Sequence, residues 1–240
     1  MAIALPMQRV AAQFVYTSHD ARSGSMGGVF ILDTSRQVEV AYRQDFMLAG
    51  MADKRVAAVW SMGRMGTAMA EYNHHGDNTY HEQQAAFGYI IKAADGLRLG
   101  VRGRWMNLGV ADSWYEPQHW LGADVIAMAL LSYCTELTVV VGTRPWDDVK
   151  PWRAMGQVAY RPSSVWMVVA AVESDNRWRM RCGMEYAYEN LLFFRAGIAT
   201  NPMLLCFGVG VKHEMLALDI GAEMHSALGL SPCCSIKLCF

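Results

Sequence analysis

Apolar and polar side chains alternate with a period of two over most of this chain. In RWRMRCGMEYAY, residues 177–188, every second residue from Trp178 to Tyr188 is apolar, and the positions between hold three arginines, Gly183, Glu185 and Ala187. Successive side chains of a β-strand point to opposite faces of the sheet, so the stretch predicts a strand with one apolar and one polar face.

The same alternation recurs from residue 37 to the C-terminus, with turn residues such as HHGDN (74–78) and ESDN (173–176) between the segments. The chain is therefore predicted to be all-β, with about 14 strands (12–14) joined mostly by tight hairpins. The predicted strands are 37–43, 54–62, 65–74, 80–92, 96–108, 119–132, 136–143, 153–162, 164–174, 177–188, 190–199, 203–212, 214–225 and 233–240.

The composition of the two faces separates the possible architectures. A soluble sandwich exposes a polar face rich in Lys, Glu, Ser and Thr. Here the less apolar faces instead combine Gly and Ala with Arg and Glu, and the other faces are bands of Leu, Val, Met and aromatic residues. Outward residues that meet lipid and inward residues that fill a narrow lumen explain both faces. We therefore expect an antiparallel transmembrane β-barrel, in which an arginine at Met180, taken as a lipid-facing midplane position, would cost about 2 to 4 kcal/mol.

Composition and charge narrow the class further. Apolar residues make up 53% of the chain and charged residues 18%, and the formal net charge of -1 argues against a nucleic-acid partner. No apolar run reaches the roughly 18 to 20 residues that a membrane helix needs. The six cysteines form neither a CxxC nor a Cys/His metal spacing. Most of them are interpreted as small apolar residues.

The two ends of the chain suggest processing and insertion signals. Residues 1–12 are interpreted as the remnant of a signal peptide, because Val10-Ala11-Ala12 is similar to a cleavage site, and the mature chain is expected to begin near Gln13. Residues 13–36, with the glycine-rich GSMGG (24–28), are expected to form an N-terminal segment that plugs the barrel of residues 37–240. The tail CCSIKLCF places Ile236, Leu238 and Phe240 on one face, a pattern that the barrel-insertion machinery of bacteria reads.

The polar faces carry enough charge of both signs to form a network in the lumen. The arginines expected there are Arg98, Arg102, Arg104, Arg177, Arg179 and Arg181. The main carboxylates expected there are Glu39, Glu71, Glu185, Asp219 and Glu223, with Glu82, Asp124, Glu136 and Glu173 on the same faces. Buried charges must be paired or wetted, so a packed lumen is the first interpretation. An open anion pore and a binding pocket are the alternatives.

Other candidate chemistry has simpler explanations. The histidines of NHHGD (73–77) and His81 could hold a metal, but a polar hairpin turn explains them equally well. His225, Ser226 and Asp219 supply the residue types of a hydrolase without any geometric signature. The tryptophans lie mostly near predicted strand ends, as an interfacial girdle requires. No enzyme, cofactor or metal is therefore expected.

Several segments resemble a known family, the small outer-membrane barrels of Bacteroidota related to PorV and PorQ, which are distantly similar to FadL-type barrels of 14 strands. The segments that carry the resemblance are DARSGSMGG (20–28), YHEQQAAFGYIIKAADGLRLGVRGRWMNL (80–108), FRAGIATNPMLLCFGVGVK (194–212) and LGLSPCCSIKLCF (228–240). RQDFMLAGMADK (43–54) departs from the family, because it lacks the Asn-Pro-Ala segment that follows the first strand in many members.

The resemblance implies a location in the bacterial outer membrane, with the lipid bilayer and the insertion machinery as partners. It also implies a non-enzymatic scaffold, in some members a component of type IX secretion with secretion-system proteins as partners. The alternative is a FadL-like transporter or channel for small hydrophobic molecules. A lumen filled by Arg and Glu side chains would favour the scaffold, and an apolar pocket beside the N-terminal segment would favour transport.

Overall fold

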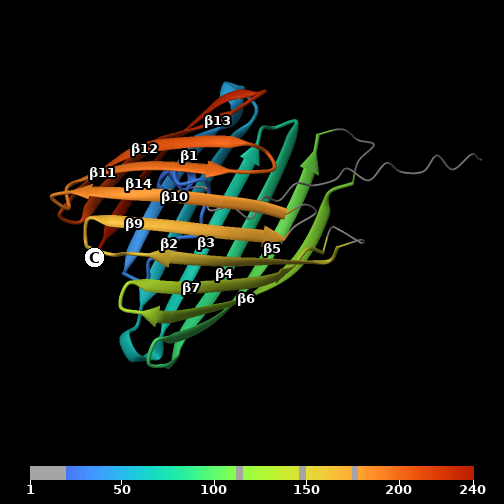
Figure 1. The fold of residues 1–240 in the computed structure, drawn as a ribbon. Helices are drawn as coiled ribbons and strands as arrows, with labels where there is room; N and C mark the ends of the chain where they lie inside the picture. The colour runs from blue at the N-terminus through green and yellow to red at the C-terminus, as the bar shows by residue number, and fades with distance from the viewer. Residues whose placement is uncertain (1–19, 112–115, 146–149, 175–177) are drawn as a thin grey trace, which may run out of the picture.

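The computed structural model describes residues 20–111, 116–145, 150–174 and 178–240, and it is a closed antiparallel barrel (Figure 1). Each strand pairs with its neighbours in sequence, and β1 pairs with β14 to close the wall. The strands are β1 Gln37–Gln44, β2 Ala52–Ser61, β3 Thr67–Gly76, β4 Tyr80–Ala94, β5 Leu97–Val110, β6 Gln118–Ser132, β7 Thr135–Thr143, β8 Trp152–Tyr160, β9 Trp166–Ser174, β10 Trp178–Tyr188, β11 Leu192–Ala199, β12 Leu204–His213, β13 Leu216–His225 and β14 Gly229–Cys239.

The predicted fold class and strand number are confirmed, and most strand ends agree within two residues. The largest difference is in β14, which was expected to begin at residue 233 and begins at Gly229. Pro232, which has no N–H group to donate to the ladder, lies within the part of β14 that was not expected. In the structure Pro232 is nevertheless the register partner of Ala222.

Burial follows the alternation that the sequence shows. In β10 the exposed residues include Met180, Cys182 and Met184, and Arg181, Gly183, Glu185 and Ala187 between and beyond them are buried. The same alternation runs through β12 and β13. One set of side chains thus forms the outer surface of the wall, and the other set fills the lumen.

Exposed aromatic side chains encircle the outer surface near each end of the barrel, so that they form two rings of residues. The exposed aromatics near the end that holds the C-terminus include Trp60, Tyr133, Tyr160, Trp166, Tyr188 and Phe240. Those toward the opposite end are Tyr42, Tyr72, Trp105, Trp152 and Trp178. Between the rings the outward residues are mostly aliphatic, as a surface in contact with lipid requires.

Two details of the outer face differ from expectation. Trp120 does not join either ring, because it packs inside against Met106 and Leu108. Met180 is the third residue of β10, so it lies near an end of the strand, and Cys182 and Met184 are the mid-strand outward residues. The midplane position was therefore misassigned, because alternation gives the face of a residue and not its depth. Trp114 and Trp146 lie outside the described residues.

The connections at the two ends of the barrel differ in length. At the end that holds the C-terminus the longest connections are the five-residue segments 62–66 and 161–165, whereas at the other end the fully described connection 45–51 has seven residues. Outer-membrane barrels have short periplasmic turns and longer external loops. We therefore call the end opposite the C-terminus the external mouth. Within the described ranges, no helix is long and apolar enough to cross a membrane.

Residues 20–36, called the N-terminal segment below, lie inside the barrel. They begin with the short helix α1, Ala21–Ser25, whose N-cap is Asp20. Met26 and Val29 are fully buried against inward residues of β8 and β9, and Phe30 and Leu32 pack on inward residues of β6, β7 and β8. Figure 1 shows this segment in blue, enclosed by the strands. Residues 1–19, including the predicted signal remnant and the expected start near Gln13, lie outside the described residues.

Glycines of the wall make room for the segment. An added Cβ on Gly183 would lie 2.5 Å from the Met26 Cβ, and one on Gly197 would lie 2.6 Å from the Met26 Cα. Gly27 itself has a φ of +81°, which disfavours any larger residue. Two inward glycines of the wall and one in the segment therefore allow the backbone at Met26 and Gly27 to lie directly against β10 and β11.

Candidate functional site in the lumen

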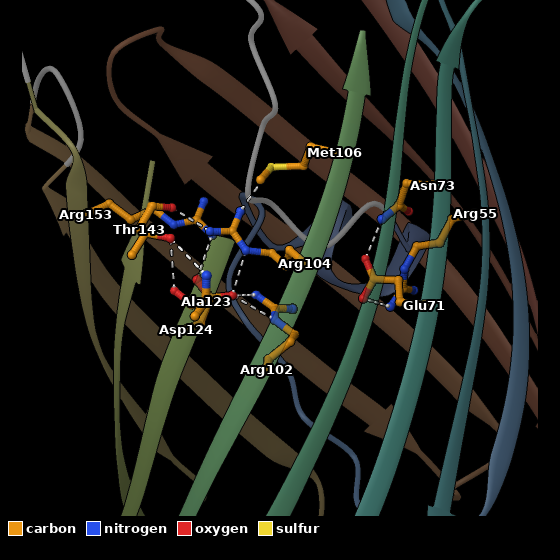
Figure 2. Close-up of polar contacts among 10 residues, drawn as sticks. All are labelled: Arg55, Glu71, Asn73, Arg102, Arg104, Met106, Ala123, Asp124, Thr143 and Arg153. Atoms are coloured by element: carbon orange, nitrogen blue, oxygen red, sulfur yellow. Dashed lines mark hydrogen bonds and ion pairs between the residues drawn. The ribbon is translucent and has the colours of Figure 1, made fainter. Parts of the chain in front are cut away.

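The most enclosed charge cluster of the lumen surrounds Asp124 of β6. Arg102 and Arg104 of β5 place guanidinium nitrogens 2.9 and 3.0 Å from its Oδ2, and Arg153 of β8 lies 3.3 Å from its Oδ1. Figure 2 shows the three arginines converging on this carboxylate, and Arg104 also donates to the Thr143 carbonyl at 2.6 Å. The side chain of Asp124 is completely shielded from solvent. This network ties β5, β6, β7 and β8 together across the inner wall.

A second cluster connects the N-terminal segment to the opposite wall. Arg22 of α1 donates twice to Glu185 of β10, through Nε at 2.9 Å and Nη2 at 2.6 Å. Arg195 of β11 donates to Glu185 and to Asp219 of β13, both at 2.6 Å. Paired two-point contacts of this kind are directional as well as strong. They fix α1 against the wall that β10, β11 and β13 form.

Two further contacts involve β9 and β10. Arg181 of β10 pairs with Glu173 of β9 at 2.6 Å and also donates to the carbonyl of Gly28 in the N-terminal segment. Arg179 lies 3.9 Å from the same Glu173. The segment is therefore held at Arg22 by its side chain and at Gly28 by its backbone.

Two further charge clusters are centred on Arg55 of β2 and Arg43 of β1. Arg55 contacts Glu39 at 3.2 Å and Glu71 at 3.4 Å, and Asn73 donates to Glu71 at 2.5 Å, as Figure 2 shows for the Glu71 contacts. Arg43 is shared among Asp45, Asp53 and Glu223. The wall beside the external mouth is thus lined by acidic groups.

The structure brings most of the residues expected in the lumen into these pairs. Arg98 pairs with Glu136 at 2.7 Å near the end of the lumen opposite the external mouth. Arg177 lies outside the described residues. Ile236, Leu238 and Phe240 lie on the outer face, with 51%, 44% and 65% of their surface exposed.

The contacts described above include arginines that were not predicted to lie in the lumen: Arg22, Arg43, Arg55, Arg153 and Arg195. The last four occupy inward positions of strands whose alternation was recognised, so their place in that alternation could have identified them as lumen residues. Arg22 has no such signal, because it reaches the lumen from a helix inside the barrel.

Two cavities lie in series within the lumen. The vestibule, of about 500 Å³, opens at the external mouth, and its lining includes Arg43, His75, Arg179, Pro202 and Leu204. The inner cavity, of about 70 Å³, lies between the N-terminal segment and β1–β4. Both cavities are lined by Asn73 and Gln84, so they adjoin at these two side chains.

The inner cavity has a mixed lining. Phe30, Ile31 and Leu32 of the N-terminal segment supply one apolar side, and Val59 and Met69 of the wall supply another. Charged residues, among them Arg55, Glu71 and Arg102, complete it. A molecule in this cavity would meet apolar surface and hydrogen-bonding groups together.

The structure separates two of the residues that were considered together as candidates for a hydrolase site, Asp219 and His225. Asp219 pairs with Arg195. His225 lies six residues farther along β13, about 20 Å from Asp219, and its Nδ1 accepts hydrogen bonds from the backbone N–H groups of Ala227 and Leu228. Asp219 and His225 therefore do not form a catalytic group.

In the β3–β4 turn, backbone N–H groups of Tyr80 and Thr79 donate to Asp77 and hold the pKa of its carboxyl below the usual value.

Comparisons with known proteins place the fold among outer-membrane barrels. A variant of the monoaromatic hydrocarbon channel TodX matches with a TM-score of 0.73 and 11% identity over 94% of this chain and 100% of that chain. The toluene transporter TbuX of Ralstonia pickettii matches with a TM-score of 0.68 and 10% identity over 92% of this chain and 98% of that chain. The outer-membrane protein Omp33 of Acinetobacter baumannii matches with a TM-score of 0.58 and 10% identity over 87% of this chain and 100% of that chain. No family model and no curated protein matches the sequence.

The wall, the apolar outer band and this likeness identify the chain as a bacterial outer-membrane β-barrel in contact with the lipid bilayer. The identities are low, so the likeness describes the fold. None of these three structures is a PorV or PorQ protein.

Proposed function

We propose that this protein is a non-enzymatic, FadL-like channel that admits small molecules across the outer membrane. The observation that carries the proposal is the succession of two cavities from the external mouth to the N-terminal segment, which meet at Asn73 and Gln84. A lumen that served only to hold the wall together would need no vestibule of about 500 Å³.

The N-terminal segment acts as the plug in this proposal. It forms one side of the inner cavity through Phe30, Ile31 and Leu32, and the ion pair between Arg22 and Glu185 holds it to the wall. A solute can pass only when the segment or the side chains at Asn73 and Gln84 move. The structure then corresponds to the closed state of the channel.

The residues that line the vestibule are suited to small, mostly apolar solutes that carry one polar group. Phe46, Met51, Pro202 and Leu204 give the vestibule an apolar part, and its acidic groups and arginines can bind a hydroxyl group. The toluene and monoaromatic hydrocarbon channels among the structural matches support a monoaromatic solute. We therefore propose hydroxylated monoaromatics ahead of plain hydrocarbons.

A second candidate is the envelope scaffold, in its most specific form a component associated with type IX secretion in a PorV/PorQ-like family. The extended ion-pair network favours it, because Asp124 and Glu185 each bind more than one arginine across the lumen. In this case the barrel wall would serve as a rigid surface for secretion-system proteins, and no solute would pass.

Uptake of labelled toluene and benzyl alcohol by cells that produce the protein separates the two candidates. Gln84 faces the lumen where the cavities meet, and Ala85 faces outward on the same strand. A Gln84→Trp variant should abolish protein-dependent uptake, the matched Ala85→Trp variant should retain it, and Gln84→Ala should increase it. Absence of protein-dependent uptake of both solutes, including in Gln84→Ala, would reject the channel and favour the scaffold.

A further inference from the structure

The histidine-rich β3–β4 hairpin sends its imidazole rings to opposite sides of the wall. His74 and His81 lie on the outer face, where their rings stack with centroids 6.0 Å apart. His75 lines the vestibule, and its Nδ1 lies 2.6 Å from the Asp53 Oδ1. Only one histidine of this hairpin is therefore available to a ligand in the lumen.

Two aspartates join His75 from other elements. Asp53 is near the start of β2, and Asp45 begins the 3-10 turn Asp45–Met47 that follows β1. One ligand atom from each of Asp45, Asp53 and His75 lies within 4.8 Å of the others. Both aspartates are buried and His75 is half-buried. Three donor groups far apart in sequence thus face one point on the vestibule wall.

The surroundings fix this arrangement. The turn that carries Asp45 is held by a hydrogen bond from the Phe46 N–H to the Ser231 hydroxyl at 2.9 Å. Arg43 contacts Asp45 at 2.6 Å and Asp53 at 3.8 Å. These contacts hold the carboxylates in place without any ion.

The local charge favours a cation. The single guanidinium of Arg43 is shared by Asp45, Asp53 and Glu223, and Glu82 is the register partner of His75 on the adjacent strand. Each carboxylate has two oxygens, so an oxygen that Arg43 does not contact can still bind a metal. A divalent ion would add positive charge to this group of carboxylates.

We propose that Asp45, Asp53 and His75 form a site for a divalent transition-metal cation on the wall of the vestibule. One imidazole nitrogen and two carboxylate oxygens are ligands of Zn²⁺ at about 2.0 to 2.2 Å. Tetrahedral ligands at that distance lie about 3.4 Å apart, so the contact between Asp53 and His75 must open by less than about 1 Å. The fourth position faces the vestibule and can bind water or a solute. The site does not depend on whether the barrel conducts.

Calorimetric titration of the folded, detergent-purified chain with ZnCl₂ tests the site. We expect one saturable site in the unmodified protein, and at least about tenfold weaker binding in His75→Gln and Asp53→Asn. His74→Gln and His81→Gln are matched controls in the same hairpin and should bind as the unmodified protein does. No saturable binding, unchanged affinity in His75→Gln, or loss of binding in the two control variants would overturn the proposal.

The six free cysteines are possible competing ligands for zinc. Co²⁺ distinguishes them, because thiolate ligands add sulfur-to-cobalt charge-transfer bands that imidazole and carboxylate do not. We expect a cobalt spectrum without those bands, and alkylation of the cysteines should leave it unchanged. Thiolate bands that disappear on alkylation would assign the metal to cysteine and refute the site. Folding of each variant is checked by the change in gel mobility that a folded barrel shows on boiling. If His75→Gln does not fold by this test, Asp45→Asn provides the same comparison from a residue outside the strands.

Discussion

Replacing Gly197 with alanine tests whether the N-terminal segment is a plug that can leave the wall. The new Cβ would lie 2.6 Å from the Met26 Cα and closer still to the Met26 carbonyl carbon and the Gly27 nitrogen. Ordinary carbon contacts are near 3.5 to 4 Å, so the segment must move by about 1 Å. Overpacking of this kind costs about 1 to 3 kcal/mol. Gly183→Ala creates a similar clash with Met26 from the adjacent strand.

The cost can be compared with what holds the segment in place. Met26 and Val29 are fully buried, and burial of each contributes about 1.5 to 3 kcal/mol. A single substitution should therefore raise the undocked population by roughly 5- to 150-fold without emptying the docked state. The double variant Gly183→Ala/Gly197→Ala should raise the undocked population further, but by less than the product of the two single effects, because both new methyl groups meet Met26.

Native cysteines provide the assay. Cys206 of β12 and Cys233 of β14 are buried inward residues, and α1 packs against both strands. Undocking should expose their thiols to a water-soluble maleimide, and mass spectrometry of the labelled peptides gives the rate at each cysteine. We expect faster labelling in Gly197→Ala and faster still in the double variant, with an unchanged heat-dependent gel shift.

Gly103 and Gly156 are the matched controls, because an added Cβ at either would meet no atom within 4 Å. Alanine at these positions should leave both labelling rates unchanged. If the double variant keeps the rates of the unmodified protein while the barrel stays folded, the argument that glycines hold the segment is wrong. An equal increase in the two controls would assign the effect to a looser wall.

Three other outcomes follow from the fold. Met184→Arg, at a mid-strand outward position, should lower the unfolding free energy by about 2 to 4 kcal/mol in urea titrations in lipid vesicles, and Met180→Arg near the strand end should cost less; equal costs would contradict the assigned depth. Arg195→Ala leaves Glu185 and Asp219 without their shared partner and should cost about 3 to 5 kcal/mol in the same titrations, against about 0 to 1 for Arg98→Ala, whose pair is partly exposed; similar losses would show that burial does not set the cost. Phe240→Ser should reduce the folded fraction in the outer membrane if the terminal aromatic is an insertion signal, whereas Leu228→Ser, exposed in the last turn, should not; unchanged folding of Phe240→Ser would exclude that role.

Period-two alternation made the barrel predictable, because each lipid-facing strand residue must be apolar and each lumen residue must fit a confined space. It could not give the partners of the charges. Asp124 was expected to face inward, but its three arginines come from β5 and β8, and their contact depends on register and barrel tilt. The path of residues 20–36 was hidden for a different reason. It depends on Gly183 and Gly197, which in a strand pattern are indistinguishable from other small inward residues.

The histidines illustrate the same limit. The sequence placed His74, His75 and His81 in one hairpin, and only their parity separates the outward pair from the inward residue. Asp45 and Asp53 come from the preceding connection and strand, and no spacing in the sequence links them to His75. A metal site assembled across three elements is visible only when the strands are in register.

The pairing of every strand with its sequence neighbours has a consequence for how such proteins can diversify. Only the seam between β1 and β14 joins strands that are distant in the chain. Duplication or loss of one complete hairpin would therefore preserve all other pairings and return the two seam strands to each other. Lumen width can thus change during evolution in steps of two strands, while the sequence rules that hold each hairpin in the bilayer remain the same.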